Sequence, residues 1–442
     1  MAFNTFIGGI HPPENKHLTE DKAFSNLSIP QLCYIPMQQH VGKPANPIVE
    51  VGDTVREGQL IGLSDGYISA NVHASVPGKV VEIGRYPTLY SKEGVCVVIE
   101  AQGAFSTSGK ILDEEQWESL TALDLINRVA EAGIVGLGGA AFPTHVKLQP
   151  PRKRQIDTLI VNGSECEPYL TVDDMLMQTH PSEIIEGVRV ALKILGITQA
   201  FIGIEKNKPK AIQALEERLT AISIPEKITV APLKVKYPQG AEKQLIHSIL
   251  KRNVPSGGLP MDVHVVVQNV GTIFAIREAV VLRKPLFERF ITVTGEIVKK
   301  PGNYKARLGT RISDVIEECG GLTEKPGKII MGGPMCGIAV DTIEIPVVKG
   351  TSGLLFLKNE EIQVSQYRPC IRCGRCVAVC PAGLMPFELV NAIEKGRYDL
   401  VEPSNPFDCI MCGSCAYCCP SKRPLNHFIR MAQEKLHKKH KQ

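Results

Sequence analysis

The chain has 442 residues, a formal net charge of +4 and 22% charged side chains. Because this length exceeds what one hydrophobic core supports, we expect about three or four domains. No long block of like charge occurs, so no nucleic-acid partner is expected. The chain carries neither a run of about 18 apolar residues nor a signal-peptide layout, which predicts a soluble or peripheral protein.

The first 29 residues contain the stretch GGIHPP at positions 8–13 and show little periodicity. They predict an ordered arm laid on another domain. His11 has either a packing or capping role there or a contact with a cofactor.

Residues 30–105 consist of short predicted strands broken by Gly and Pro, which indicates a small β-domain. The stretches VGDTVREGQLIG (51–62) and ASVPGKVVEIG (74–84) resemble lipoyl and biotinyl carrier domains. In those domains a hairpin presents a modifiable lysine. Here Lys79 follows Pro-Gly and lacks the preceding Met or Asp of the carriers. We therefore predict a barrel-sandwich scaffold without a prosthetic group.

Residues 115–265 alternate between helical and strand patterns, which predicts an α/β domain. The expected helices are 123–132, 182–195 and 208–219, and the expected strands are 158–161, 200–204 and 228–235.

A glycine-rich stretch, GLGGAAFPTHVK at 136–147, lies inside this domain. Glycines let backbone N–H groups approach a phosphate, and Lys147 can add a point charge. The stretch is neither a Walker loop nor a G-x-G-x-x-G turn, so an ordinary loop is the alternative. The segment NGSECEP (162–168) follows a predicted strand, where α/β sheets place ligands.

Together these segments resemble the FMN and NADH motifs of the flavin subunit of respiratory complex I. The stretches YPQGAE (237–242) and NVGT (269–272) resemble two further elements of that family, whereas Leu137, Ser164 and Ala241 depart from its pattern. The resemblance implies flavin contacts at Gly136, Gly138, Gly139, Lys147, Asn162 and Glu165. It also implies cofactor contacts at Gly240 and Glu242, and contacts with the nicotinamide nucleotide at Phe142 and at Glu167, the expected catalytic residue.

Residues 266–357 follow a strand, turn, strand, helix order, with FITVTGEIVKKPGNY at 290–304 and a helix at 312–319. They resemble the soluble-ligand-binding β-grasp domain. The stretch MGGPM at 331–335 predicts a tight turn rather than a phosphate site.

Residues 358–430 contain two cysteine runs, CIRCGRCVAVCP (370–381) and CIMCGSCAYCCP (409–420). Three thiolates at three-residue spacing can wrap a [4Fe–4S] cluster, and the fourth Cys of each run ligates the other cluster in two-cluster ferredoxins. The predicted ligands are Cys370, Cys373, Cys376 and Cys419 for one cluster and Cys380, Cys409, Cys412 and Cys415 for the other. Cys418 is then spare. Zinc sites favour separated knuckles, and disulfides lack a secretory context.

The order of arm, barrel-sandwich, flavin domain, β-grasp domain, two-cluster domain and basic tail (431–442) resembles the RnfC family of the Rnf electron transport complex. That resemblance implies a multidomain α/β and α+β fold with two [4Fe–4S] clusters, non-covalent FMN and NAD(H) as substrate. It further implies a peripheral ferredoxin:NAD⁺ oxidoreductase subunit at the cytoplasmic face of the inner membrane, with the other Rnf subunits and, indirectly, ferredoxin as partners. The alternatives are a soluble flavin and iron–sulfur reductase, such as a cobalamin reductase, and a scaffold whose flavin site has decayed.

Overall fold

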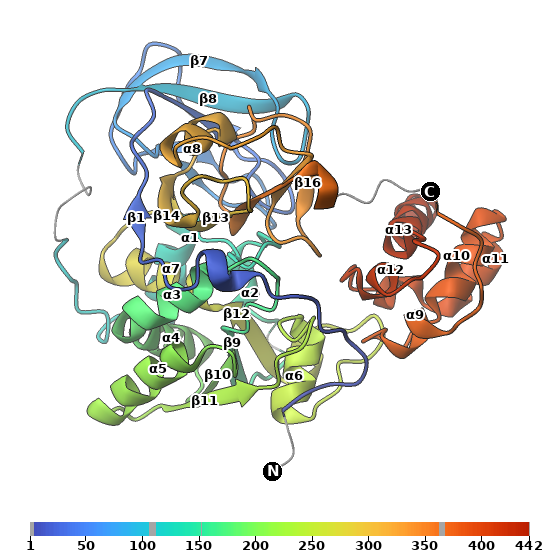
Figure 1. The fold of residues 1–442 in the computed structure, drawn as a ribbon. Helices are drawn as coiled ribbons and strands as arrows, with labels where there is room; N and C mark the ends of the chain where they lie inside the picture. Colours follow the sequence, from blue (N-terminus) through green and yellow to red (C-terminus); the bar gives the residue numbers. More distant parts are fainter. Residues whose placement is uncertain (1–3, 106–111, 152, 362–366, 442) are drawn as a thin grey trace.

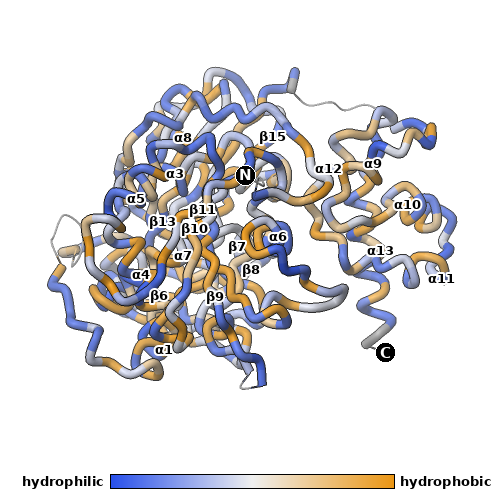
Figure 2. The backbone as a smooth tube through the Cα atoms, turned by 90° about the horizontal axis from the view of Figure 1, so that it is seen from below, coloured by the Kyte–Doolittle hydropathy of each residue, from blue (hydrophilic) through white to orange (hydrophobic). Residues whose placement is uncertain are grey.

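The computed structural model describes residues 4–105, 112–151, 153–361 and 367–441. Part of the predicted linker 358–367 and part of the stretch between the first two domains lie outside these residues. Four packed units follow one another along the chain, and the last forms a separate lobe beside the others (Figures 1 and 2).

The N-terminal arm crosses two of the units. Its backbone pairs with Tyr237 at Ile10, forms a short 3₁₀ turn at Lys16–Leu18, and ends in strand β1 (Ser25–Asn26), which pairs with β14.

The barrel-sandwich unit holds two antiparallel sheets around one apolar core. The four-stranded sheet has the order β2 (Leu32–Pro36), β8 (Gly94–Ala101), β7 (Gly78–Tyr86) and β4 (Thr54–Val55). The other sheet has the order β3 (Asn46–Pro47), β5 (Leu60–Leu63) and β6 (Val72–His73).

The central α/β unit is a parallel sheet in the order β11 (Lys227–Leu233), β10 (Gln199–Glu205), β9 (Thr158–Asn162) and β12 (Val265–Asn269). These strands are apolar runs, as expected for a sheet covered on both faces. Its helices are α1 (Ala122–Glu131), α2 (Thr144–Lys147), α3 (Val172–Thr179), α4 (Pro181–Leu195), α5 (Pro209–Ala221), α6 (Glu242–Leu250) and α7 (Val270–Val281). The 3₁₀ turn Pro260–Val263 precedes β12.

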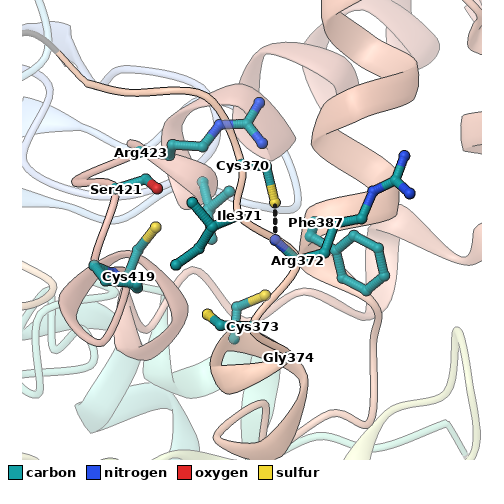
Figure 3. Close-up of a pocket in the computed structure, with 12 residues that line it drawn as sticks. Cys370, Ile371, Arg372, Cys373, Gly374, Phe387, Cys419, Ser421 and Arg423 are labelled. Atoms are coloured by element: carbon teal, nitrogen blue, oxygen red, sulfur yellow. Dashed lines mark hydrogen bonds between the residues drawn. The ribbon is translucent and has the colours of Figure 1, made fainter.

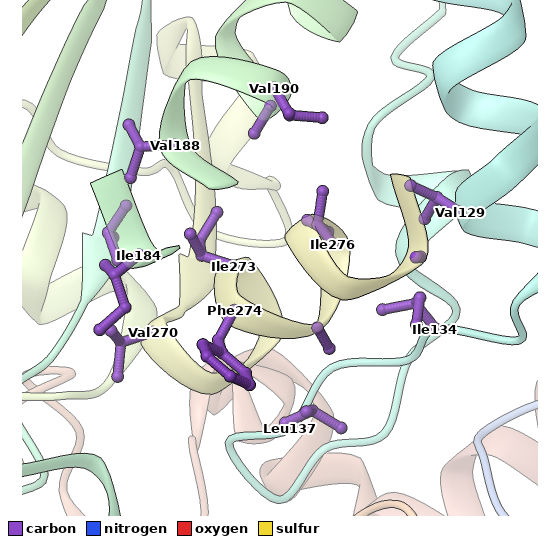
Figure 4. Packing of buried hydrophobic residues seen from close by; sticks show 14 of the residues in the cluster. Val129, Ile134, Leu137, Ile184, Val188, Val190, Val270, Ile273, Phe274 and Ile276 are labelled. Atoms are coloured by element: carbon purple, nitrogen blue, oxygen red, sulfur yellow. The ribbon is translucent and has the colours of Figure 1, made fainter. Parts of the chain in front are cut away.

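Helix α7 is buried almost all round and packs against α4 and α1 (Figure 4). Asn269 begins this helix, because its side-chain oxygen accepts hydrogen bonds from Gly271 N (2.9 Å) and Thr272 N (3.3 Å), a typical N-cap. The predicted boundary between residues 265 and 266 therefore needs correction. Strand β12 and helix α7 complete the sheet and core of the central unit instead of opening the next one.

The β-grasp unit is a six-stranded sheet in the order β1, β14 (Gly302–Arg307), β13 (Glu288–Thr294), β17 (Gly353–Leu357), β15 (Lys328–Met331) and β16 (Ile338–Val340). Helix α8 (Ile312–Glu318) packs on the core of this unit through Ile312 and Val315.

The last unit, here called the cysteine-rich module, covers residues 367–441. Its helices are α9 (Arg375–Ala378), α10 (Pro386–Glu394), α11 (Tyr398–Val401), α12 (Ser414–Tyr417) and α13 (Leu425–Lys441), with 3₁₀ turns at Glu402–Ser404 and Pro406–Asp408. Helices α10 and α13 supply much of its apolar core. Residues 431–441 of the predicted basic tail continue α13, and residue 442 lies outside the described residues. Within the described residues, no helix is both long and apolar enough to span a membrane.

Candidate electron-transfer site

Two pockets in the cysteine-rich module are lined by the two predicted sets of cysteines. The first cysteine pocket is lined by Cys370, Cys373, Cys376 and Cys419, and Figure 3 shows three of them with Ile371 and Arg423. The second cysteine pocket is lined by Cys380, Cys409, Cys412 and Cys415.

Local backbone geometry explains this grouping. Gly374 and Gly413 begin the short helices α9 and α12 in the left-handed conformation, with φ of 74° and 73°, a region that glycine enters without strain. Each turn brings three cysteines of one run together, and the fourth comes from the other run. Backbone N–H groups of Arg372 and Leu384 donate to the sulfurs of Cys370 and Cys380, each at 3.4 Å. A donor set of four sulfurs with backbone N–H donors fits an iron–sulfur cluster.

Cys418 lines neither cysteine pocket, and its sulfur instead donates to the carbonyl of Cys415 at 3.4 Å. In the described parts of the chain, no three His, Cys, Asp or Glu side chains are grouped so as to hold a single metal ion. Which cysteines bind each cluster stays a prediction. Each predicted set of four cysteines lines one pocket.

The predicted flavin residues gather at the carboxyl edge of the central sheet. Lys147 Nζ lies 2.5 Å from Glu242 Oε1, and Asn162 Nδ2 donates to Gly240 O at 2.8 Å. A Cβ on Gly138 would lie 3.3 Å from the side chain of Asn269. The glycine-rich loop, Lys147 and the segment after β9 thus face one region.

Two observations show that this region fits a phosphate-bearing ligand such as FMN. Gly138 and Gly139 are exposed, Gly139 has a φ of +100°, and no atom lies within 4 Å of where its Cβ would stand. The hydroxyl of Ser164 is buried and has no hydrogen-bond partner in the structure. An open glycine loop beside a lysine, with an unsatisfied buried hydroxyl nearby, suits a phosphorylated polar ligand.

Glu165 contacts the start of helix α3. Its carboxylate accepts hydrogen bonds from Asp173 N (2.7 Å) and Asp174 N (3.2 Å) at the start of α3. Burial raises its pKa to about 7, although Lys16 opposes the shift. The carboxylate therefore anchors helix α3, and a flavin contact from this residue stays a prediction.

Glu167 lies where the central unit meets the β-grasp unit, next to Tyr237, which contacts the cysteine-rich module. Its carboxylate accepts hydrogen bonds from Met335 N (3.0 Å), Cys336 N (2.9 Å) and the hydroxyl of Tyr237 (3.3 Å). Burial raises the pKa of Glu167, and these donors lower it. The predicted contact between Glu167 and the nucleotide stays a prediction, because both carboxylate oxygens already serve this junction. Phe142, its predicted companion, is half-buried in the glycine-rich loop.

Tyr237 connects the junction directly to the second cysteine pocket. Its hydroxyl donates to the carbonyl oxygen of Cys412 at 2.8 Å and lies 3.0 Å from Cys336 Sγ. Burial raises the pKa of this hydroxyl far above its usual value, and burial also raises the pKa of the Cys336 thiol to about 12. Both groups therefore remain protonated and neutral at physiological pH.

Further contacts hold the second cysteine pocket against the central unit. Gly9 N donates to Val379 O at 2.8 Å, and Gln244 Nε2 of α6 donates to Pro381 O at 3.0 Å. The carboxylate of Asp408 accepts from Ser256 Oγ at 2.6 Å.

Lys16 holds the N-terminal arm against the segment after β9. Its buried ammonium donates to the carbonyls of Glu165 (3.0 Å), Glu167 (3.1 Å) and Leu170. Sequence reasoning missed Lys16 and Cys336, and used Tyr237 only as part of a motif. His11 lines a polar pocket beside Cys166, Glu205 and Tyr237.

Comparison with known proteins identifies the family. Residues 4–104 match the RnfC barrel sandwich hybrid domain, 129–278 the Nuo51 FMN-binding domain, 290–339 the SLBB domain and 362–427 a 4Fe-4S dicluster domain. The RnfC protein of the proton-translocating ferredoxin:NAD(+) oxidoreductase complex of Clostridium ljungdahlii is 46% identical over 96% of this chain and 93% of its own length. The chain belongs to the RnfC family.

Other RnfC-family members agree. The RnfC protein of the Na(+)-translocating ferredoxin:NAD(+) oxidoreductase complex of Acetobacterium woodii is 44% identical over 99% of this chain and 98% of its own length. The RnfC protein of the ion-translocating oxidoreductase complex of Rhodobacter capsulatus is 42% identical over 88% of this chain and 75% of its own length. A solved NAD⁺-reducing [NiFe]-hydrogenase shares the fold with a TM-score of 0.51, at 18% identity, over 72% of this RnfC chain and 61% of its own. The predicted barrel-sandwich, flavin, β-grasp and two-cluster domain types are confirmed.

Proposed function

We propose that this chain is the peripheral electron-transfer subunit of a membrane-bound, ion-translocating ferredoxin:NAD⁺ oxidoreductase. It exchanges electrons between NAD(H), non-covalent FMN and two [4Fe–4S] clusters, and partner subunits couple this exchange to ion transport. The names of relatives at 42–46% identity and the FMN-binding and dicluster domain matches support this function over a soluble cobalamin reductase.

When bound, a flavin can accept one hydride, which carries two electrons, from a nicotinamide and pass the electrons singly to iron–sulfur clusters. In our proposal the loop Gly136–Gly139 and Lys147 hold the flavin phosphate, and Asn162 with Gly240 orients the flavin at the sheet edge. Phe142 covers the nucleotide. The two predicted sets of four cysteines hold the clusters.

The observation that carries this proposal is the hydrogen bond from Tyr237 to Cys412 at the junction with the central unit. Because Tyr237 begins the same short stretch that carries Gly240 and Glu242, this contact supports a second cluster next to the flavin region. The module's described contacts with the arm and the central unit come from residues 379–381 and 408–412, which supports a first cluster farther from the flavin. This order gives a path from nucleotide to flavin to second cluster to first cluster.

Anaerobic preparation and stopped-flow absorbance test the function. We expect about eight irons, about eight acid-labile sulfides and one FMN per chain, and NADH should reduce the flavin before the clusters. A preparation that holds clusters and flavin but shows no cluster reduction by NADH would rule out the proposed path. Zinc in place of iron would rule out the cluster assignment.

We place the chain at the cytoplasmic face of the membrane, where NAD(H) is available. Protease digestion of right-side-out and inverted vesicles tests this side, and alkaline carbonate extraction tests peripheral attachment. Cleavage in right-side-out vesicles or retention after carbonate would contradict the proposal.

A further inference from the structure

The two ends of the cysteine-rich module differ in charge and exposure. The segments that form the second cysteine pocket, 380–386 and 405–415, carry one charged residue, Asp408. The carboxylate of Asp408 accepts hydrogen bonds from Ser256 Oγ and Gly257 N of the central unit. The only charge of these segments is therefore paired within the chain, although Met385 and Phe407 stay exposed.

The segments around the first cysteine pocket, 367–378 and 416–424, carry five cations and no carboxylate. Arg423 is buried and paired with Glu394 of α10. The remaining four, Arg368, Arg372, Arg375 and Lys422, are exposed. Glu388 follows the lining residue Phe387 and is exposed, and no described ion pair joins it to these cations.

Large apolar side chains are exposed among these cations. Ile371, between two residues of the first pocket, is 67% exposed, and Tyr417 is 51% exposed. Cys373, a predicted cluster ligand, is itself exposed. An apolar centre with a charged rim is the usual anatomy of a protein interface.

We propose that this surface, the first-pocket face (Arg368, Ile371, Arg372, Arg375, Tyr417 and Lys422), docks an acidic face of a protein partner that carries its own one-electron redox centre. The inference rests on the proposed function, in which the first cluster is the far end of the internal path. Electrons must leave or enter the chain at that end, and the contacts with the arm and the central unit described above come from residues 379–381 and 408–412 instead. Uncompensated positive charge there attracts and orients an acidic partner before contact.

The test uses the double variant Arg375→Glu with Lys422→Glu. We leave Arg372 unchanged because its backbone N–H donates to Cys370. The matched control, Lys395→Glu with Arg430→Glu, reverses two other exposed charges of the same module. Each purified protein is added to membranes from a strain that lacks this subunit but retains the remaining subunits, and bound protein is measured at several salt concentrations.

We expect the double variant to bind at least about tenfold more weakly than wild type at low salt, and the difference to shrink as salt screens the charges. The control should bind as wild type does. A zero-length carbodiimide should join Lys422 of the wild type to a carboxylate of a partner subunit. Equal binding of the double variant and wild type would overturn the proposal.

Protein-free vesicles with anionic lipid provide the second comparison. If wild type binds them as tightly as it binds the membranes, and the double variant loses both, the face serves lipid and our proposal is wrong. Reduction of flavin and clusters by NADH within each purified chain is recorded separately. If NADH fails to reduce the flavin and clusters of the wild type, the proposed function is wrong. The binding measurements would still show whether this face docks a protein partner.

Discussion

Replacing Tyr237 by Phe removes one hydroxyl from the junction and leaves the ring in place. The hydroxyl has one proton to donate, and Cys412 O at 2.8 Å is a nearer acceptor than Glu167 at 3.3 Å, so the variant leaves the carbonyl of Cys412 without its donor. Leaving a buried acceptor unsatisfied costs about 1–3 kcal/mol. We therefore expect the docking of the second cysteine pocket on the central unit to weaken by about 5- to 150-fold.

Amide hydrogen exchange measures this change directly, because the Gly9 amide donates to Val379 O across the junction. Its protection should fall by the same factor when opening is in fast equilibrium. The amides of Met335 and Cys336 join the β-grasp unit to Glu167 and report separately on the loss of the contact between Tyr237 and Glu167. Stopped-flow absorbance should show slower cluster reduction, with the flavin reduced by NADH at the wild-type rate.

Tyr417→Phe is the matched control, since this tyrosine lies in the same module but is 51% exposed. It should leave the three amides and the cluster reduction rate unchanged. If Tyr237→Phe also leaves protection unchanged, the hydroxyl does not hold the junction and our account of the path fails.

Three further predictions follow from the same contacts. Cys376→Ala should lose about half of the iron, whereas Cys418→Ala should keep all of it; equal losses in iron analysis would show that the ligand register is wrong. Lys147→Ala should lose FMN during gel filtration, because the phosphate loses its ammonium partner, and full retention would remove Lys147 from the site. Burial would raise the pKa of Glu288, but Lys284 and nearby cations lower it to about 2. The ionised Glu288 carboxylate therefore stabilises the folded state. Because the unfolded carboxyl titrates near pH 4.5, this contribution is complete above that pH and is lost as the pH falls toward 2. Glu288→Gln should therefore unfold with about 3 kcal/mol less free energy at neutral pH and show a flatter pH dependence below 4.5 in denaturant titrations.

Local spacing made the cysteine sets predictable. Three cysteines at three-residue intervals come together in one turn of the backbone whatever the rest of the chain does. The grouping of the cysteines could therefore be predicted from residues 370–381 and 409–420 alone. The Gly136–Lys147 loop is also a local motif. Its surroundings were predictable only through resemblance, because contacts such as Asn162 with Gly240 join residues far apart in sequence.

The junction could not be predicted from spacing. Tyr237 and Cys412 are 175 positions apart, and Lys16 reaches carbonyls about 150 positions away. No periodic pattern encodes such pairs, because each is chosen by how whole units pack. The same reason explains the misplaced boundary at 265. Strand β12 is a short apolar run whose membership in a sheet depends on pairing with β9 more than 100 residues earlier.

Glu167 shows how a family motif and a structure can assign one carboxylate differently, and Glu167→Gln separates the two assignments. The structure commits both oxygens to Met335 N, Cys336 N and Tyr237. An amide keeps one acceptor and turns its NH₂ group toward a donor, which costs about 1–3 kcal/mol at a buried site. We therefore expect slower cluster reduction and weaker amide protection, with KM for NADH and the rate of flavin reduction near wild type.

The decisive measurement is the NADH dependence of flavin reduction, recorded in the same traces as cluster reduction. A carboxylate that touches the nucleotide would raise KM or slow the flavin step when neutralised. A carboxylate that holds the junction acts only after the flavin. Glu167→Asp provides the conservative comparison, because it keeps the charge but shortens the reach to the 335–336 backbone. If the flavin step slows in Glu167→Gln while amide protection at Met335 and Cys336 is unchanged, the junction role is wrong and the residue serves the nucleotide.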